Sequence, residues 1–137
     1  MDARELFQEV VSPNYREFIE RPNDIRLLWN ALVSMNSVAE YLALERLNYA
    51  STSRQVIIYV ANKVREQYDL EDLELCADTL KHLRKTSGSR AKFELTATSS
   101  GVSSDPSTWM IGDRKFVDVL RRAFEKLKDI PELKPPP

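Results

Sequence analysis

One long amphipathic segment constrains the fold of this chain more than any other part of its sequence. Between Asn23 and Asn48, apolar residues recur at steps of three and four, the pattern of a helix with a single apolar face. These residues are Ile25, Leu28, Trp29, Leu32, Met35, Ala39, Leu42, Ala43 and Leu47. At 1.5 Å per residue such a helix would be about 37 Å long, enough to span a small domain. We therefore expect the other elements to pack against it.

Two short helices are predicted before this central helix. Asp2, followed three residues later by Glu5, resembles a capping box, and apolar residues follow at helical spacing. Ser12-Pro13 is expected to end the first helix and begin the second, because proline suits the first turn of a helix and not its interior. Pro22 ends the second helix, and Asn23 is the predicted N-cap of the central one.

Two more helices are predicted after the central one. Apolar spacing indicates a third helix that ends near Gln67, and a short connection makes it antiparallel to the central helix. Asp69 is the expected N-cap of a fourth helix from about Leu70 to Thr86. Acidic residues dominate its start and basic residues its end, which suits the helix dipole.

The hydrophobic period changes after the fourth helix. Phe93 to Thr98 alternates apolar and polar residues, which is typical of a half-buried strand, and the apolar run Thr108–Ile111 is its expected partner. Gly112 is predicted to turn the chain and Asp113 to cap a last helix that Pro131 ends. The sequence thus predicts a mainly α, antiparallel bundle of four to five helices with a small two-stranded β-hairpin before the last helix.

Composition limits the class of protein. At 137 residues, the chain is expected to form one helical domain (1–137) with a Pro-rich C-terminal tail (131–137) that adds no core residues. The formal net charge of −1 does not favour nucleic acid or anionic membrane through overall charge. No segment is apolar enough to span a membrane or to act as a signal peptide, so we expect a soluble cytoplasmic protein.

A polar cluster between the central and fourth helices is the first candidate site. Asn36 and Glu40 lie one turn apart on the central helix, and Asp78 and His82 lie one turn apart on the fourth, beside Lys81. If the two helices face each other, these groups could converge, and a histidine beside a carboxylate can act as acid or base near neutral pH. The same residues could equally reach water or form a structural hydrogen-bond network.

A basic run at the end of the fourth helix is the second candidate. It contains no acidic residue and comprises Lys81, Arg84, Lys85, Arg90 and Lys92. Such residues could contact nucleic-acid phosphates, but basic residues at a helix end are also explained by the helix dipole. No aromatic residue interrupts the run to provide base stacking.

Other catalytic chemistry finds little support in the sequence. Cys76 falls on an apolar helical face, where a thiol is usually a small buried hydrophobe. A metal site would need His82 together with Asp78, Glu40 or Glu74, and this spacing matches no recognised motif. We therefore predict no metal and no cofactor.

Two sequence patterns carry a family resemblance. LWNALVSMNSVAEYLAL, followed some thirty residues later by LCADTLKHLRK, resembles a set of small bacterial helical proteins whose arrangement is similar to the HEPN superfamily. The resemblance covers roughly Asn23 to Lys85. It implies a helical bundle that commonly dimerises, and either a ribonuclease of a toxin or defence system or a non-catalytic binding module.

The chain departs from the catalytic HEPN pattern, which is an arginine, four to six residues and then a histidine. The residues five to seven positions before His82 are Ala77, Cys76 and Leu75. The resemblance therefore favours a non-catalytic protein that binds a partner or small ligand through Asn36, Glu40, Asp78 and His82. The alternatives are an RNase-like enzyme that uses His82 with Lys81 or Arg84, and a nucleic-acid binder that uses the run Lys81 to Lys92.

A homodimer is expected on two grounds. HEPN proteins commonly dimerise, and this chain contains more large aromatic surface than one small bundle needs. Trp29, Tyr41, Tyr49 and Trp109 are the residues expected to contribute that surface.

Overall fold

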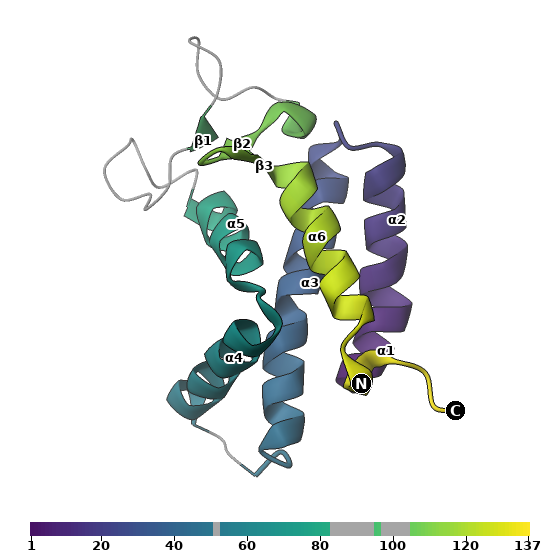
Figure 1. The fold of residues 1–137 in the computed structure, drawn as a ribbon, viewed down its shortest axis with the longest axis vertical. Helices are drawn as coiled ribbons and strands as arrows, with labels where there is room; N and C mark the ends of the chain where they lie inside the picture. The colour runs from purple at the N-terminus through teal and green to yellow at the C-terminus, as the bar shows by residue number, and fades with distance from the viewer. Residues whose placement is uncertain (51–52, 83–94, 97–104) are drawn as a thin grey trace.

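The computed structural model describes residues 1–50, 53–82, 95–96 and 105–137 (Figure 1). In this part of the chain the protein is mainly helical, with one small antiparallel sheet, as the sequence predicts. None of the described helices combines the length and the apolar character that crossing a bilayer requires.

The N-terminal segment is helical without a break. α1 (Ala3–Leu6) continues through the π-helical segment η1 (Phe7–Val11) into α2 (Ser12–Glu20). The predicted interruption at Ser12-Pro13 is therefore wrong. Proline lacks an amide donor, and its ring crowds the preceding turn. The wider π turn, in which the Ser12 amide donates to the Phe7 carbonyl, accommodates that proline without ending the helix.

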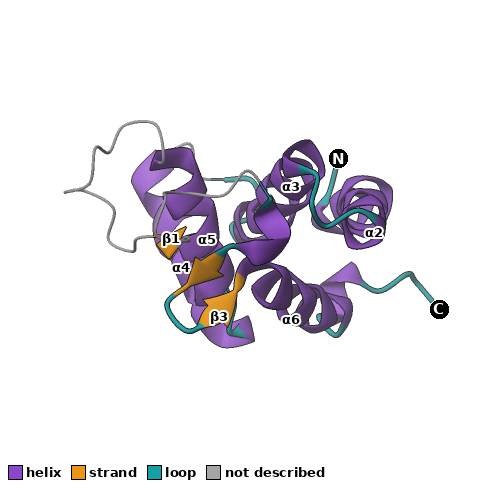
Figure 2. Ribbon diagram, turned by 90° about the horizontal axis from the view of Figure 1, so that it is seen from above, coloured by secondary structure: helices purple, strands orange, loops and turns teal. Residues whose placement is uncertain are grey.

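The predicted central helix is confirmed as α3 (Ile25–Arg46). Its N-cap is Asp24 rather than Asn23, because the Asp24 carboxylate accepts from the amides of Arg26 at 2.9 Å and Leu27 at 3.2 Å. Figure 2 shows α3 between α2 and α6 on one side and α4 and α5 on the other. It contacts α1, α2, α4, α5 and α6, and is thus the element against which the rest of the bundle packs.

α4 (Arg54–Tyr68) and α5 (Glu71–His82) follow α3. Asp69 does not cap α5 as predicted. It is the C-cap of α4 and adopts a left-handed conformation with φ of 56°, in which its own amide donates back to the carbonyls of Arg65 and Glu66. A left-handed residue at a helix end is usually glycine or asparagine, so spacing alone did not reveal this aspartate's role.

The sheet has one strand more than predicted. β1 (Leu95–Thr96) pairs antiparallel with β2 (Met110–Ile111), and β2 pairs antiparallel with β3 (Arg114–Lys115). Gly112, with φ of +61°, supplies the turn between β2 and β3, as expected. β3 is short and fully polar, so it carries none of the apolar alternation by which a strand is recognised in a sequence.

The last helix, α6 (Phe116–Lys128), begins at β3. Its N-cap is Lys115, so the prediction that Asp113 caps it is wrong: Asp113 belongs to the hairpin turn. A short 3-10 helix, η2 (Pro106–Thr108), precedes β2.

The C-terminal segment also differs from its prediction. A second 3-10 helix, η3 (Pro131–Leu133), contacts α1, and the side chain of Leu133 is only 1 % exposed. The tail therefore contributes one residue to the core, whereas none was expected.

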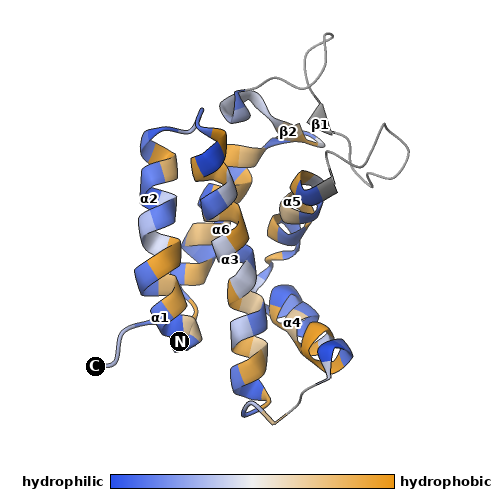
Figure 3. Ribbon diagram, turned by 180° about the vertical axis from the view of Figure 1, so that it is seen from behind, coloured by the Kyte–Doolittle hydropathy of each residue, from blue (hydrophilic) through white to orange (hydrophobic). Residues whose placement is uncertain are grey.

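Exposed apolar side chains gather on α4, and the ribbon in Figure 3 shows hydrophobic residues along part of this helix. Val56, Ile58 and Tyr59 are exposed there, and Tyr49 and Trp29 are exposed on or beside α3. Trp109 was expected among the exposed aromatics, but it is buried and packs edge-on against Phe116 with ring centroids 5.9 Å apart. Tyr41 is partly buried against the core.

Candidate functional site

The structure places the predicted polar cluster as follows. The Glu40 carboxylate accepts from the guanidinium of Arg54 on α4, at 3.2 and 3.3 Å, and so is engaged by α4. Asp78 lies on the exposed face of α5. The side chain of His82 lies outside the described residues, so the convergence of these groups stays a prediction.

A buried arginine near Asn36 was not predicted. Arg65 on α4 is 8 % exposed, and its guanidinium donates to Asn62 Oδ1 at 2.9 Å and to the Asn36 main-chain carbonyl at 3.5 Å. It also forms an ion pair with Glu74 of α5 at 3.3 Å. One side chain thus ties α3, α4 and α5 together. Its burial could have been found from the sequence, because Arg65 lies four residues after the buried Ala61 and so shares the inner face of α4.

The predicted basic run is described at one position only. Lys81 is exposed on the last turn of α5. Arg84, Lys85, Arg90 and Lys92 lie outside the described residues, so a nucleic-acid surface formed by this run stays a prediction.

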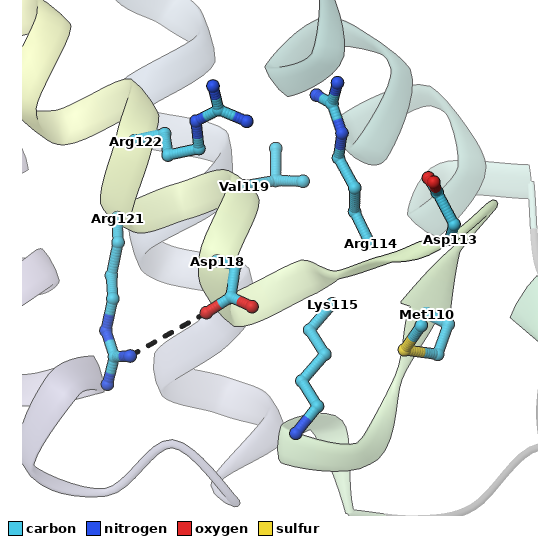
Figure 4. Close-up of a pocket in the computed structure, with 8 residues that line it drawn as sticks. All are labelled: Met110, Asp113, Arg114, Lys115, Asp118, Val119, Arg121 and Arg122. Carbon is cyan, nitrogen blue, oxygen red and sulfur yellow. Dashed lines mark ion pairs between the residues drawn. The ribbon is translucent and has the colours of Figure 1, made fainter.

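A cavity lies between the β2–β3 hairpin and the first two turns of α6, and we call it the arginine cleft (Figure 4). Its volume is about 590 Å³. Its lining is mostly charged and consists of Met110, Asp113, Arg114, Lys115, Asp118, Val119, Arg121 and Arg122.

Local geometry explains why these residues meet. Successive strand residues point to opposite faces, so Arg114 and Lys115 of β3 extend in different directions, as Figure 4 shows. Val119 and Arg122 lie three residues apart on α6 and so share a helix face. The guanidinium groups of Arg114 and Arg122 consequently lie at the same edge of the cleft, on either side of Val119.

The cleft carries a positive charge. Among the described lining residues, four cations exceed two carboxylates, which gives these residues a formal charge of +2. Arg121 forms an ion pair with Asp118 at 3.8 Å, and Arg114 forms one with Asp72 of α5, outside the cleft lining. Within the described part of the chain, Lys115 and Arg122 form no ion pair or hydrogen bond through their side chains. Two cations therefore remain available to an external anion.

A second ionic contact lies beside the small space between α5 and α6, next to the arginine cleft. Lys126 donates to the carboxylate of Asp69 at 2.8 Å. This hydrogen bond, together with the positive charge of Lys126, lowers the pKa of Asp69, and the more distant charges of Arg122 and Arg114 act in the same direction. Arg114 and Arg122 line this space as well as the cleft, so they face carboxylates on one side and the open cavity on the other.

The described side chains of the cleft are mainly arginine, lysine and aspartate. None of these described lining residues is a histidine, cysteine, serine or tyrosine, and Asp113, Asp118 and Lys115 are the ones that can carry a proton. Cys76 lies elsewhere, fully buried on α5, and burial raises the pKa of its thiol to about 12. Among the described residues, no group of three or more acidic, histidine or cysteine side chains could hold a metal ion.

Sequence reasoning missed the arginine cleft for a specific reason. Its basic residues are interleaved with Asp113 and Asp118, so the segment Asp113–Arg122 does not look like a basic run. Only the two-residue turn at Gly112 and the start of α6 at Phe116 bring the basic side chains around one cavity.

Comparisons with known proteins add no relative. No protein-family model, no curated protein and no solved structure matches this chain. The HEPN resemblance accordingly stays a prediction.

Proposed function

We propose that this chain is a non-catalytic helical binding protein that recognises an anionic ligand or partner through the arginine cleft. The observation that supports this proposal is the cavity charge of +2, with Lys115 and Arg122 free of ion pairs within the described residues. Arginine and lysine side chains around an open cavity attract anions and form charge-assisted hydrogen bonds with them.

The non-catalytic part of the proposal has two supports. No histidine, cysteine, serine or tyrosine side chain is among the described residues that line the cleft. No arginine lies five to seven residues before His82, where catalytic members of the HEPN superfamily carry one. We keep the HEPN-like bundle as part of this proposal, and the RNase-like alternative through His82 as its competitor.

Titration calorimetry with tripolyphosphate tests the proposed function. Wild-type protein should bind this polyanion with an affinity that falls as salt is raised, because exposed charges are screened over about 10 Å at 0.1 M salt. The double variant Lys115→Gln, Arg122→Gln should lose most of that affinity. Arg16→Gln, an exposed arginine on α2, is the matched control and should bind like wild type. Equal binding by wild type and the double variant would reject the cleft as the site.

We also propose that a second copy of the chain covers the outer face of α4. Val56 and Tyr59 are exposed at helical spacing there, and Ile58 lies beside them. Lys63 and Glu66, which pair with each other at 3.6 Å, extend the same face with both signs of charge. A two-fold axis would set this face against itself, as an isologous dimer requires. Sedimentation equilibrium at micromolar concentration should show a dimer that Tyr59→Lys dissociates, whereas a monomeric wild type would reject this interface.

A further inference from the structure

Resting on the proposed function, we infer that the ligand of the arginine cleft carries a phosphate dianion, which takes Arg114 from Asp72 and is held between Arg114 and Arg122. The ligand class is thus a phosphate monoester or a terminal phosphate group, rather than a single carboxylate. Asp72 is the internal competitor of that ligand.

The position of Arg114 is the first ground for this inference. Its guanidinium pairs with Asp72 of α5, yet Arg114 also lines the open cleft. Both side chains of the pair are about half exposed, at 49 % and 50 %. An ion pair that is open to water contributes little to stability and exchanges readily, so an external anion can replace the carboxylate.

Arg122 provides the second ground. It lines both the cleft and the space that contains Asp72, and it has no ion-pair partner among the described residues. Figure 4 shows its guanidinium on the opposite side of Val119 from that of Arg114. An anion at this edge of the cleft would therefore meet two guanidinium groups, one of which is already unpaired.

The charge that the ligand needs follows from its competition with the Asp72 carboxylate for Arg114. Asp72 belongs to the same chain, so its effective concentration at Arg114 is far above that of a dilute ligand, on the order of millimolar or more. A monocarboxylate would only exchange one carboxylate for another. A phosphate dianion has the charge and the oxygen atoms to accept from both guanidinium groups, and arginine suits such bidentate recognition. Once released, the half-exposed Asp72 carboxylate returns to water.

The lining points away from recognition of a large organic group. Among the described residues that line the cleft, Met110 and Val119 are the only apolar ones, and none is aromatic. Pockets for drug-sized ligands are mainly apolar and aromatic. The phosphate group itself, rather than a ring attached to it, is therefore the part that this cleft recognises.

Two probes that share a phenyl ring and differ in their anionic group test the ligand class by titration calorimetry. Phenyl phosphate should bind and benzoate should not, because only the former carries a dianion near neutral pH. The second pKa of a phosphomonoester is about 6, so phenyl phosphate should bind several-fold more weakly as the pH falls from 7.5 to 5. The carboxylates that face the site are Asp69, Asp72, Asp113 and Asp118.

Matched variants test the competition. Asp72→Asn frees Arg114 and should tighten phenyl phosphate about two- to fivefold, the worth of an exposed ion pair. Asp113→Asn removes one negative charge from the same cleft without freeing Arg114, and should tighten it less. Arg122→Gln should weaken binding by about tenfold or more, because a hydrogen bond to a charged group is lost. Circular dichroism should show each variant folded.

The outcomes separate this inference from the proposed function. Equal affinity for benzoate and phenyl phosphate would overturn the ligand class, and equal effects of Asp72→Asn and Asp113→Asn would overturn the competition. In both cases the cleft would still bind anions. If phenyl phosphate, benzoate and tripolyphosphate all fail to bind, the proposed function falls with the inference.

Discussion

Lys126 donates from its Nζ to both the carboxylate and the main-chain carbonyl of Asp69, each at 2.8 Å. Asp69 is the left-handed C-cap of α4, so this contact joins the last helix of the chain to the junction between α4 and α5. The two residues are 57 positions apart, which makes the contact one of the long-range ties that close the bundle.

Stability should depend on pH through Asp69. Its pKa in the folded protein lies below the ordinary value of 3.8, so the folded state binds protons less readily than the unfolded state. Its stabilising contribution is therefore complete above about pH 4 and is lost as the pH falls through the lowered pKa. Asp69→Asn should melt below wild type at pH 7, and the difference should shrink towards pH 2. A difference that stays constant with pH would contradict this assignment.

The free energy of unfolding should depend on the ion pair between Arg65 and Glu74. Because Arg65 is 8 % exposed, Glu74→Gln would leave its guanidinium with only the oxygens of Asn62 and Asn36. We expect the free energy of unfolding in urea to fall by about 1–3 kcal/mol. Glu66→Gln breaks an exposed ion pair with Lys63 on the same helix and should cost less than about 0.5 kcal/mol. Equal costs would show that burial does not distinguish the two pairs.

The packing at the junction of the hairpin and α6 should depend on the side chain of Phe116. Its side chain is fully buried and supports Trp109, the residue just before β2. Phe116→Ala should lower the free energy of unfolding by about 3–5 kcal/mol and shift the fluorescence of Trp109 towards that of an exposed indole. Trp29→Phe removes the other tryptophan and isolates this signal. An unchanged emission maximum in that background would contradict the observed packing.

The thiol of Cys76 should be unreactive in the folded protein. It is fully buried, and with a pKa of about 12 almost none of it is thiolate at pH 8. Ellman's reagent should modify it slowly under native conditions and rapidly in guanidinium. Rapid native modification would show that α5 opens or that the thiol is accessible.

The strongly periodic parts of the sequence predicted the fold well. α3 has so many apolar residues at helical spacing that a few polar residues on the same face do not obscure the pattern. Its position between the other helices follows from its length. Ends and irregular elements were less predictable. Whether Pro13 ends a helix depends on a π turn, and whether Asp69 begins or ends one depends on a left-handed backbone that a lysine 57 residues away helps to hold.

The candidate site was less predictable than the fold for a physical reason. Sequence spacing shows which residues share a helix face, but not which faces meet. The contact between Glu40 of α3 and Arg54 of α4, for example, could not be read from the spacing of either helix. Arg114 and Arg122 come together only because a two-residue turn folds β3 back beside the start of α6. No local pattern in the sequence records that juxtaposition.

Backbone amide chemical-shift mapping with phenyl phosphate tests the central claim most directly, because it locates the bound anion without any substitution. The largest shifts should fall in Met110–Lys115 and in the first two turns of α6, with smaller ones near Asp72 as it leaves Arg114. Saturable shifts confined to other parts of the chain, with the hairpin and α6 unchanged, would contradict the assignment of the arginine cleft as the binding site.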